Sequence, residues 1–360
     1  MRHYCLSSHF FLLYTHITMY KTEVTHKTLH FIAPAGTSRG VYTKREIWLI
    51  KLYSDEFPGR CGVGECSPLP DLSCDALPDY EERLNLLCRN FEQTGKINRG
   101  LLLPYPSILF GLEVALLNLQ NGDKLFDTPF SNGEVGIPFN GLVWMGTFDE
   151  MSKRIEEKIN DGFTCVKLKI GAIDFQSELS LIKSIRKRFS KDAIELRVDA
   201  NGGFTPKDAP WKLDELAKYD IHSIEQPIRQ KQWKEMSHLC SNTPLPIALD
   251  EELIGINMKD MKEELLDIIK PQYIVLKPSL HGGISGTEEW VEHSSKRGIG
   301  SWITSALESN IGLDAVAQLA SHLYGNDIKI PQGLGTGLLY ADNFPSRTVI
   351  KNNKIWRTQE

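Results

Sequence analysis

The sequence predicts an α/β fold built around a barrel of the TIM type, with an α+β region before it. Three observations predict the barrel. After about residue 135, short β-rich runs alternate with polar runs of helical length. From the second run on, they start at steps of 23 to 29 residues, the length of a strand, a helix and two loops. Charged residues stand late in successive strands, where such barrels carry their active sites. A doubly wound open sheet is the alternative.

The chain before the barrel mixes strand and helix patterns. We expect an N-terminal extension at 1–19, an α+β domain at 20–132, the barrel at 133–335, and a segment at 336–360 that returns to the α+β domain. The α+β domain shows three strand patterns and then two helix patterns, at 20–31, 45–54, 59–70, 75–95 and 106–122. A turn-rich run, 124–136, is the predicted linker.

The barrel region holds eight strand patterns. They are short, rich in β-branched and aromatic residues, and separated by runs long enough for a helix. The eight runs are 135–144, 165–171, 194–202, 222–228, 245–253, 273–280, 300–309 and 328–335.

Composition excludes several classes of protein. The net charge of -5 argues against a nucleic-acid binder, which needs a basic patch, and no run reaches the length of a membrane span. Seven cysteines without a C-x-x-C pair fit a reducing compartment, so we expect a cytoplasmic protein. The expected partner is a small molecule, and the sequence leaves open whether the chain is a monomer or a homo-oligomer.

Three carboxylates end three successive predicted strands. Asp199 lies in LRVDANGG, Glu225 in SIEQPI and Asp250 in IALDEEL. Carboxylates brought together at one barrel mouth need a proton or a cation. Oxygen ligands without Cys or His favour Mg²⁺, with Mn²⁺ as a substitute, over Zn²⁺. Glu251 and Glu252 follow directly, and Asp250 is preferred as the ligand by its place at the strand end.

Three lysines accompany these acids. Lys167 and Lys169 stand two positions apart in CVKLKIG, so they point to the same side of an otherwise apolar strand. Lys277, in YIVLKPSL, ends a strand on the opposite side of the barrel. A neighbouring cation lowers the pKa of a lysine toward the range where it accepts a proton. Together, lysines and metal predict removal of a proton from the carbon next to a carboxylate.

The ordered motifs K-x-K, D-x-N, E-Q-P, D-E and L-K-P resemble the enolase superfamily, in its muconate-lactonizing subgroup. The resemblance covers nearly the whole chain after about residue 20 and implies a capping α+β domain on a modified (β/α)7β barrel. Within the subgroup the chain most resembles the o-succinylbenzoate synthase family, lyases of menaquinone biosynthesis. The stretches that carry this are GVGECSPLPDLS, PSILFGLEVALLNL and ITSALESNIGLDAVAQLA.

The resemblance implies a role for each site residue. Asp199, Glu225 and Asp250 would hold Mg²⁺, and Lys169 would remove the proton and assist loss of water in a syn elimination. Lys167 would keep Lys169 poised, and Lys277 would stabilise the enediolate. Loops 36–44 and 64–73 of the cap would close over the barrel. The residues expected to contact the substrate or brace the site are Asn201, Ser305, Glu308 and Ser309.

Three alternatives remain at this point. A dipeptide or N-acylamino acid epimerase would use Lys169 and Lys277 as two bases on opposite faces, and a muconate-type cycloisomerase would use the same residues on another substrate. The region IPQGLGTGLLYADN lacks the D-x-D pair expected of a dipeptide epimerase. A barrel that only binds its ligand would have no use for a lysine with a lowered pKa.

Overall fold

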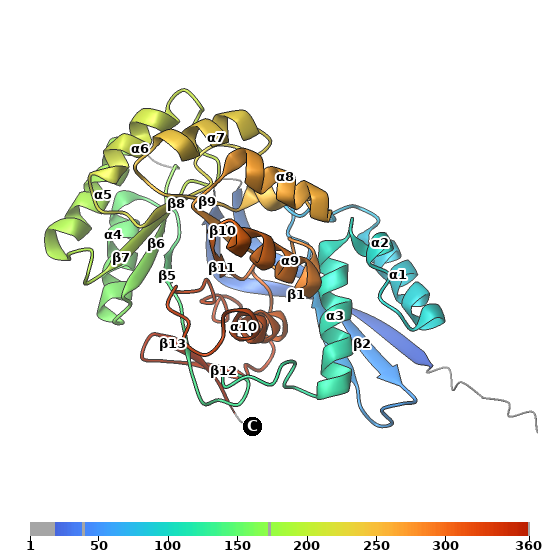
Figure 1. Cartoon of the computed structure of the whole chain (residues 1–360). Helices are drawn as coiled ribbons and strands as arrows, with labels where there is room; N and C mark the ends of the chain where they lie inside the picture. The colour runs from blue at the N-terminus through green and yellow to red at the C-terminus, as the bar shows by residue number, and fades with distance from the viewer. Residues whose placement is uncertain (1–18, 38–39, 172–173, 359–360) are drawn as a thin grey trace, which may run out of the picture.

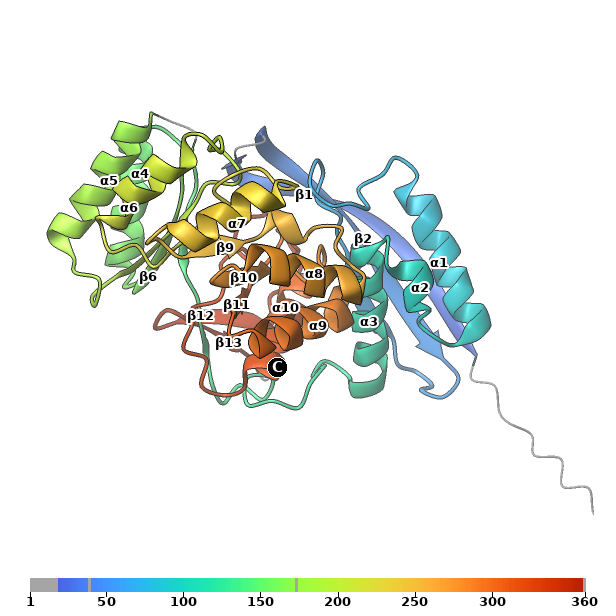
Figure 2. The same cartoon turned by 45° about the horizontal axis from the view of Figure 1, so that its top comes forward.

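The computed structural model describes residues 19–37, 40–171 and 174–358. The expected N-terminal extension therefore lies outside the described residues, apart from Met19. Figures 1 and 2 show a barrel ringed by helices, beside a smaller layer of strands and helices from the N-terminal part of the chain. The predicted α/β barrel with an α+β cap is confirmed.

The N-terminal layer is a three-stranded antiparallel sheet covered by helices. Its strands follow one another in the order β1-β2-β3. The elements are β1 (Tyr20–Thr37), β2 (Gly40–Ser54), β3 (Gly62–Cys66), α1 (Tyr80–Thr94), α2 (Arg99–Leu102) and α3 (Pro106–Asn121). The sequence patterns missed the short α2, and both long strands extend further than expected.

Glycines let α3 lie directly on β3. A Cβ atom at Gly64 would come within 1.9 Å of the Gly111 carbonyl oxygen, and one at Gly62 within 2.1 Å of the Ala115 oxygen. The backbone of β3 at GVGEC therefore lies directly against the backbone of α3 at LFGLE. This contact fixes the position of α3, the helix that also contacts the barrel.

Seven parallel strands form the barrel sheet, in the order β11-β10-β9-β8-β7-β6-β5. They are β5 (Gly141–Val143), β6 (Cys165–Lys169), β7 (Glu195–Asp199), β8 (Ser223–Glu225), β9 (Ile247–Leu249), β10 (Tyr273–Leu276) and β11 (Gly300–Ile303). The helices after them are α4 (Phe148–Asn160), α5 (Phe175–Arg188), α6 (Ala209–Ala217), α7 (Trp233–Asn242), α8 (Lys259–Ile269), α9 (Gly283–Lys296) and α10 (Asn310–Tyr324), with a 3-10 turn at Glu251–Leu253.

The eighth predicted strand, 328–335, closes the barrel without forming a regular strand. Gln332 bridges to Phe139 beside β5, and Gly333 bridges to Thr304 beyond β11. Pro331 has no N–H to donate and Gly333 lacks a side chain, so the pairing is limited to these two positions. The barrel is nevertheless complete, because this segment joins the two edges of the seven-stranded sheet.

The C-terminal segment contacts both halves of the molecule. The backbone N–H of Ile32 in β1 donates to the Leu339 carbonyl, and the N–H of Ala341 donates to the His30 carbonyl. The chain then forms an antiparallel hairpin that pairs with a short strand at the start of the barrel region. These strands are β12 (Thr348–Lys351), β13 (Lys354–Arg357) and β4 (Ile137–Pro138).

Two cap carboxylates hold the N-termini of two barrel helices. Glu65 of β3 accepts hydrogen bonds from the N–H groups of Ser309 (2.9 Å) and Gly312 (3.0 Å) at the start of α10. Glu113 of α3 accepts from the N–H groups of Ile284 (2.6 Å) and Ser285 (3.3 Å) in α9. Unpaired N–H groups at a helix start favour a carboxylate, so these contacts attach the cap to the barrel.

Burial raises the pKa of Glu113 to about 7, against hydrogen bonds that lower it. Because the folded pKa lies above the ordinary 4.5, stability is lost as pH rises from about 4.5 to about 7. We expect Glu113→Gln to be more stable than the wild type at pH 8 by about 1–2 kcal/mol, and this gain to vanish near pH 4.5. Thermal unfolding across this range measures it, with exposed Glu134→Gln as control. A gain that does not change with pH would contradict the prediction.

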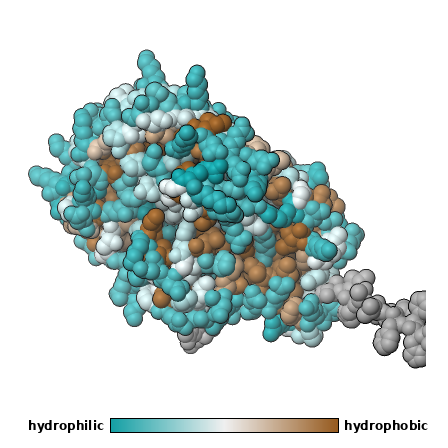
Figure 3. All heavy atoms as spheres, in the orientation of Figure 1, coloured by the Kyte–Doolittle hydropathy of each residue, from teal (hydrophilic) through white to brown (hydrophobic). Residues whose placement is uncertain are grey.

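None of the described helices is both long enough and apolar enough to cross a bilayer. Figure 3 shows a face covered mostly by hydrophilic residues, with hydrophobic residues exposed between them. The large apolar side chains pack instead in one core that fills the barrel region and in a second core between the cap sheet and its helices.

Candidate active site

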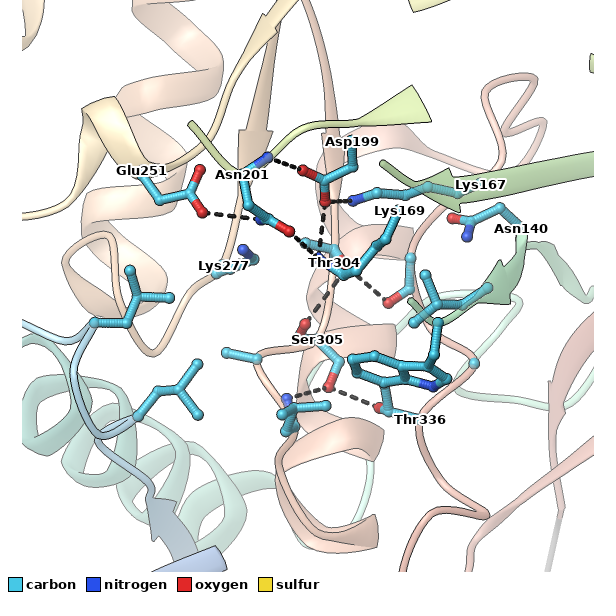
Figure 4. A pocket seen from close by; sticks show the side chains of 18 of the residues that line it. Asn140, Lys167, Lys169, Asp199, Asn201, Glu251, Lys277, Thr304, Ser305 and Thr336 are labelled. Carbon is cyan, nitrogen blue, oxygen red and sulfur yellow. Dashed lines mark hydrogen bonds and ion pairs between the residues drawn. The ribbon is translucent and has the colours of Figure 1, made fainter. Parts of the chain in front are cut away.

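An open cavity of about 840 Å³ lies at the carboxyl ends of the barrel strands, beneath the cap. In barrels of this type the strand ends and the loops that follow them carry the reacting groups. Figure 4 shows side chains from several strands converging on this cavity. Its walls include apolar residues of the cap, Leu69 and Leu72, and of the barrel, Leu142, Trp144, Trp302 and Leu307.

The two lysines of β6 point into the barrel, and both line the cavity. Their neighbours Val166 and Leu168 are fully buried on the other side of the strand. The Lys167 ammonium lies 2.9 Å from Asp199 and 2.6 Å from Glu225. Carboxylates on the next two strands therefore compensate the paired positive charges that the sequence places here.

Lys169 is held by a different set of partners. Its ammonium group donates to Asp199 at 3.0 Å and to the Asn201 side-chain oxygen at 2.6 Å. The Asn201 amide in turn donates to Glu251 at 3.0 Å (Figure 4). Asn201 thus lies next to the Lys169 ammonium group and itself lines the cavity.

Lys277 reaches the cavity from the opposite side. It directly follows β10, which three strands separate from β6 in the sheet. Its ammonium group forms an ion pair with Asp250, which directly follows β9. Lys169 and Lys277 therefore flank the cavity, while Asp250 and Glu225 lie behind it and are not among its lining residues.

The charged side chains of this cluster shift one another's pKa values. Burial alone would lower the pKa of Lys167, but Asp199 and Glu225 outweigh it and raise that pKa. Burial would also lower the pKa of Lys277, but the negative charge of Asp250 raises it. For Glu225, burial and the negative charge of Asp199 raise the pKa despite the nearby Lys167. The raised pKa of Lys167 is opposite to the lowering expected for the paired lysines of β6, whereas the raised pKa of Lys277 agrees with its expected protonated state.

The carboxylates do not form a ready-made metal cluster. Among the described residues, no group of three or more Asp, Glu, His or Cys side chains is arranged to hold one ion. The Lys167 ammonium instead lies between Asp199 and Glu225, in contact with both. Lys277 takes up Asp250 in the same way.

The same three carboxylates have the chemistry of a divalent-ion site. All three are buried, and they end adjacent strands. Glu225 and Asp250 each keep a buried oxygen atom without a hydrogen-bond partner in the described part of the chain. Buried carboxylate oxygens of this kind are costly unless a cation or a donor meets them. The residues therefore fit Mg²⁺, although the lysines would have to give up their carboxylate partners.

The remaining predicted residues divide into two groups. Ser305 lines the cavity, as expected. Glu308 is buried behind the wall and accepts hydrogen bonds from Ser305 and from Ser279, each at 2.6 Å. Ser309 caps α10 and donates to Glu65. Glu308 and Ser309 thus hold the loops after β10 and β11 in place and do not reach the cavity surface.

Sequence reasoning missed several lining residues. Most of them are apolar or neutral, and they come from elements distant in the sequence. Such residues carry no spacing signal, because their position depends on how the cap sits on the barrel. Besides most of the apolar wall, the missed residues are Asn140, Thr304, Gly333, Gly335 and Thr336, whereas Tyr42, Leu69 and Leu72 come from the two cap loops that were expected to close over the barrel.

Comparison with known proteins identifies the family. A family model described as "Enolase C-terminal domain-like" matches residues 150–357, more than half of the chain. The chain belongs to the enolase superfamily. A second model, described as "MenC, N-terminal domain", matches residues 37–119. The predicted family is confirmed, and the two matches fall on the barrel region and the cap.

One curated relative of this superfamily is similar along nearly its whole length. The o-succinylbenzoate synthase of Desulfotalea psychrophila is 45% identical over 355 residues, covering 89% of this chain and 95% of the relative. The crystal structure of MenC from the same organism has a TM-score of 0.82 at 40% identity, and the match covers 94% of this chain and 99% of that one.

More distant superfamily members share the fold. The dipeptide epimerase of Enterococcus faecalis, solved with Mg and the dipeptide L-Leu-L-Tyr, has a TM-score of 0.80 at 20% identity and covers 96% of this chain and 98% of its own. At this identity the similarity establishes the fold alone.

Proposed function

We propose that this enzyme is an o-succinylbenzoate synthase of menaquinone biosynthesis, a hydro-lyase. The observation that carries this proposal is the 45% identity to such a synthase over almost the full length of both chains. The site geometry agrees with it, because Lys169 and Lys277 flank a cavity with apolar walls. Such a cavity suits a small carboxylate with a carbon ring.

The reaction removes water from 2-succinyl-6-hydroxy-2,4-cyclohexadiene-1-carboxylate and gives 2-succinylbenzoate. Lys169 takes the proton from the carbon next to the carboxylate, and the C–H electron pair moves into the carboxylate as an enediolate. The same amine, now protonated, gives its proton to the departing hydroxide, so water leaves from one face of the ring. The ring becomes aromatic, which makes the step favourable.

The other residues of the site support this transfer. Lys277 stays protonated and stabilises the negative charge of the enediolate from the opposite side of the cavity. Lys167 lies beside Lys169 on the same face of β6, and we assign it the role of keeping Lys169 in place for the proton transfer. Asn201 orients Lys169 through its 2.6 Å hydrogen bond.

Asp199, Glu225 and Asp250 would hold Mg²⁺, with Mn²⁺ as a substitute. When bound, the ion supplies positive charge for the substrate carboxylate and withdraws the carboxylates from the lysines. The carboxylate attraction that raises the pKa of Lys167 and Lys277 would then weaken.

The second candidate is an epimerase of dipeptides or N-acylamino acids. The observation in its favour is that Lys169 and Lys277 line the cavity from opposite sides, as two-base epimerisation requires. An epimerase would exchange the α-hydrogen of its substrate with solvent and scramble the configuration.

The test is turnover of the cyclohexadiene substrate by purified protein with Mg²⁺, followed by the absorbance of the aromatic product. We expect stoichiometric 2-succinylbenzoate. In parallel, incubation of N-succinylamino acids and dipeptides in D₂O is followed by NMR. Absence of aromatic product, together with deuterium incorporation and loss of configuration, would replace the lyase by the epimerase.

A further inference from the structure

Arg45, in β2 of the cap, is a buried arginine held by backbone carbonyls. Its side chain is 1% exposed, and its hydrogen-bond partners among the described residues are backbone carbonyls. Its N–H groups donate to the Ser67 carbonyl at 2.5 Å, to the Pro68 carbonyl, and at 3.4 and 3.5 Å to the carbonyls of Leu307 and Ala306. A buried cation needs such partners, and here two separate loops provide them.

These two loops form two walls of the cavity. The first, 67–73, belongs to the cap and contributes Leu69 and Leu72 to the lining. The second, 305–307, follows β11 in the barrel, and all three of its residues line the cavity. The planar guanidinium of Arg45 therefore connects a cap wall to a barrel wall from behind, without reaching the cavity itself.

The barrel wall depends on this support because of the backbone at Leu307. Leu307 has a φ of 66°, in the left-handed region that a bulky residue rarely adopts. Its N–H donates to the Ser305 hydroxyl at 3.1 Å, and its carbonyl accepts from Arg45 and from the Tyr340 hydroxyl at 2.7 Å. Such a conformation costs energy and persists only where several contacts enforce it.

We infer that Arg45 is a positioning residue for the reaction, which sets the distance between the cap wall and the barrel wall that enclose the non-reacting part of the substrate. The inference rests on the proposed function for its kinetic consequence. Lys169, Lys277 and the three carboxylates lie on or directly after β6 to β10 and belong to neither loop. Loss of Arg45 therefore weakens substrate binding, measured as KM, more than it slows the chemical step, measured as kcat.

The kinetic test compares Arg45→Met with Arg83→Met, a control on an exposed arginine of α1. We expect Arg45→Met to raise KM about tenfold while kcat stays within about threefold, and the control to change neither. Arg45→Lys should behave like Arg45→Met, because one ammonium cannot span carbonyls on both loops. Millimolar guanidinium ion should restore KM in Arg45→Ala. An unchanged KM in Arg45→Lys would overturn the inference.

A second measurement does not depend on the substrate. Hydrogen exchange of 67–73 and of 305–308 is compared between the wild type and the variants without any ligand. We expect faster exchange in both segments together for Arg45→Lys, and wild-type exchange for Arg83→Met. Faster exchange in only one segment, or in neither, would show that Arg45 does not couple the walls. Because this readout needs no turnover, its failure is distinguishable from failure of the proposed function.

Discussion

Replacement of Lys169 by alanine should abolish turnover of the cyclohexadiene substrate, with a fall in kcat of about 10⁴-fold. This is the upper end of a general base contribution, and we expect it because in the proposed mechanism the same amine first removes the proton and then returns it to the leaving hydroxide. The fold should survive, since Asp199 keeps its contact with Lys167 at 2.9 Å. Circular dichroism and kcat check both statements, with Lys183→Ala on the exposed side of α5 as control.

Arginine variants separate the role of Lys169 from that of Lys277. Arginine stays protonated in proteins, so Lys169→Arg keeps the charge and cannot act as a base. Lys277→Arg keeps the positive charge that the enediolate needs. We therefore expect Lys169→Arg to be as inactive as Lys169→Ala, and Lys277→Arg to be more active than Lys277→Ala. If Lys169→Arg were active and Lys277→Arg inactive, Lys277 would be the base and Lys169 the electrostatic group. Near-normal turnover in Lys277→Ala would show that Lys277 does not stabilise the enediolate.

The sequence predicts those parts of the fold that depend on repetition. Parallel strands separated by helices recur at nearly constant spacing, and seven of the eight predicted strands contribute a strand to the barrel sheet. The eighth, which contains Pro331, forms only bridges because its register depends on two edges that the fold must first bring together. The path of the C-terminal hairpin beside β4 likewise has no local signal.

The residues of the candidate site divide in the same way, into those that local sequence patterns predict and those that depend on the assembled fold. Lys167, Lys169 and Asp199 reach the cavity because strand periodicity and strand ends fix their directions. Arg45 was not predicted, since a lone arginine within TKREIWLI reads as a surface charge. Its burial depends on carbonyls of two loops that are distant in the sequence. The pairing of lysines with carboxylates also depends on distances that spacing alone does not give.

Removal of divalent cations should have the second large effect on the enzyme. We expect excess EDTA to lower kcat by at least about 10³-fold, equivalent to several kcal/mol of lost charge stabilisation, and Mg²⁺ or Mn²⁺ to restore it. A readout besides activity is the melting temperature. At 100 times its dissociation constant Mg²⁺ should stabilise the wild type by about 2.7 kcal/mol, because it binds the folded protein alone.

The Glu225→Gln variant tests whether the predicted carboxylates are the ligands. Glutamine keeps the shape of the side chain and removes its buried negative charge. In the wild type, the Glu225 Oε1 atom has no hydrogen-bond partner among the described residues. In EDTA the variant should melt close to the wild type, because loss of a costly buried charge is offset by loss of its 2.6 Å ion pair with Lys167. It should lose most of the Mg²⁺-dependent rise in melting temperature, whereas Glu264→Gln on the exposed side of α8 should retain it. A full Mg²⁺ response in Glu225→Gln would place the ion elsewhere, because a site built on three carboxylates from adjacent strands does not keep its affinity when one of them becomes neutral.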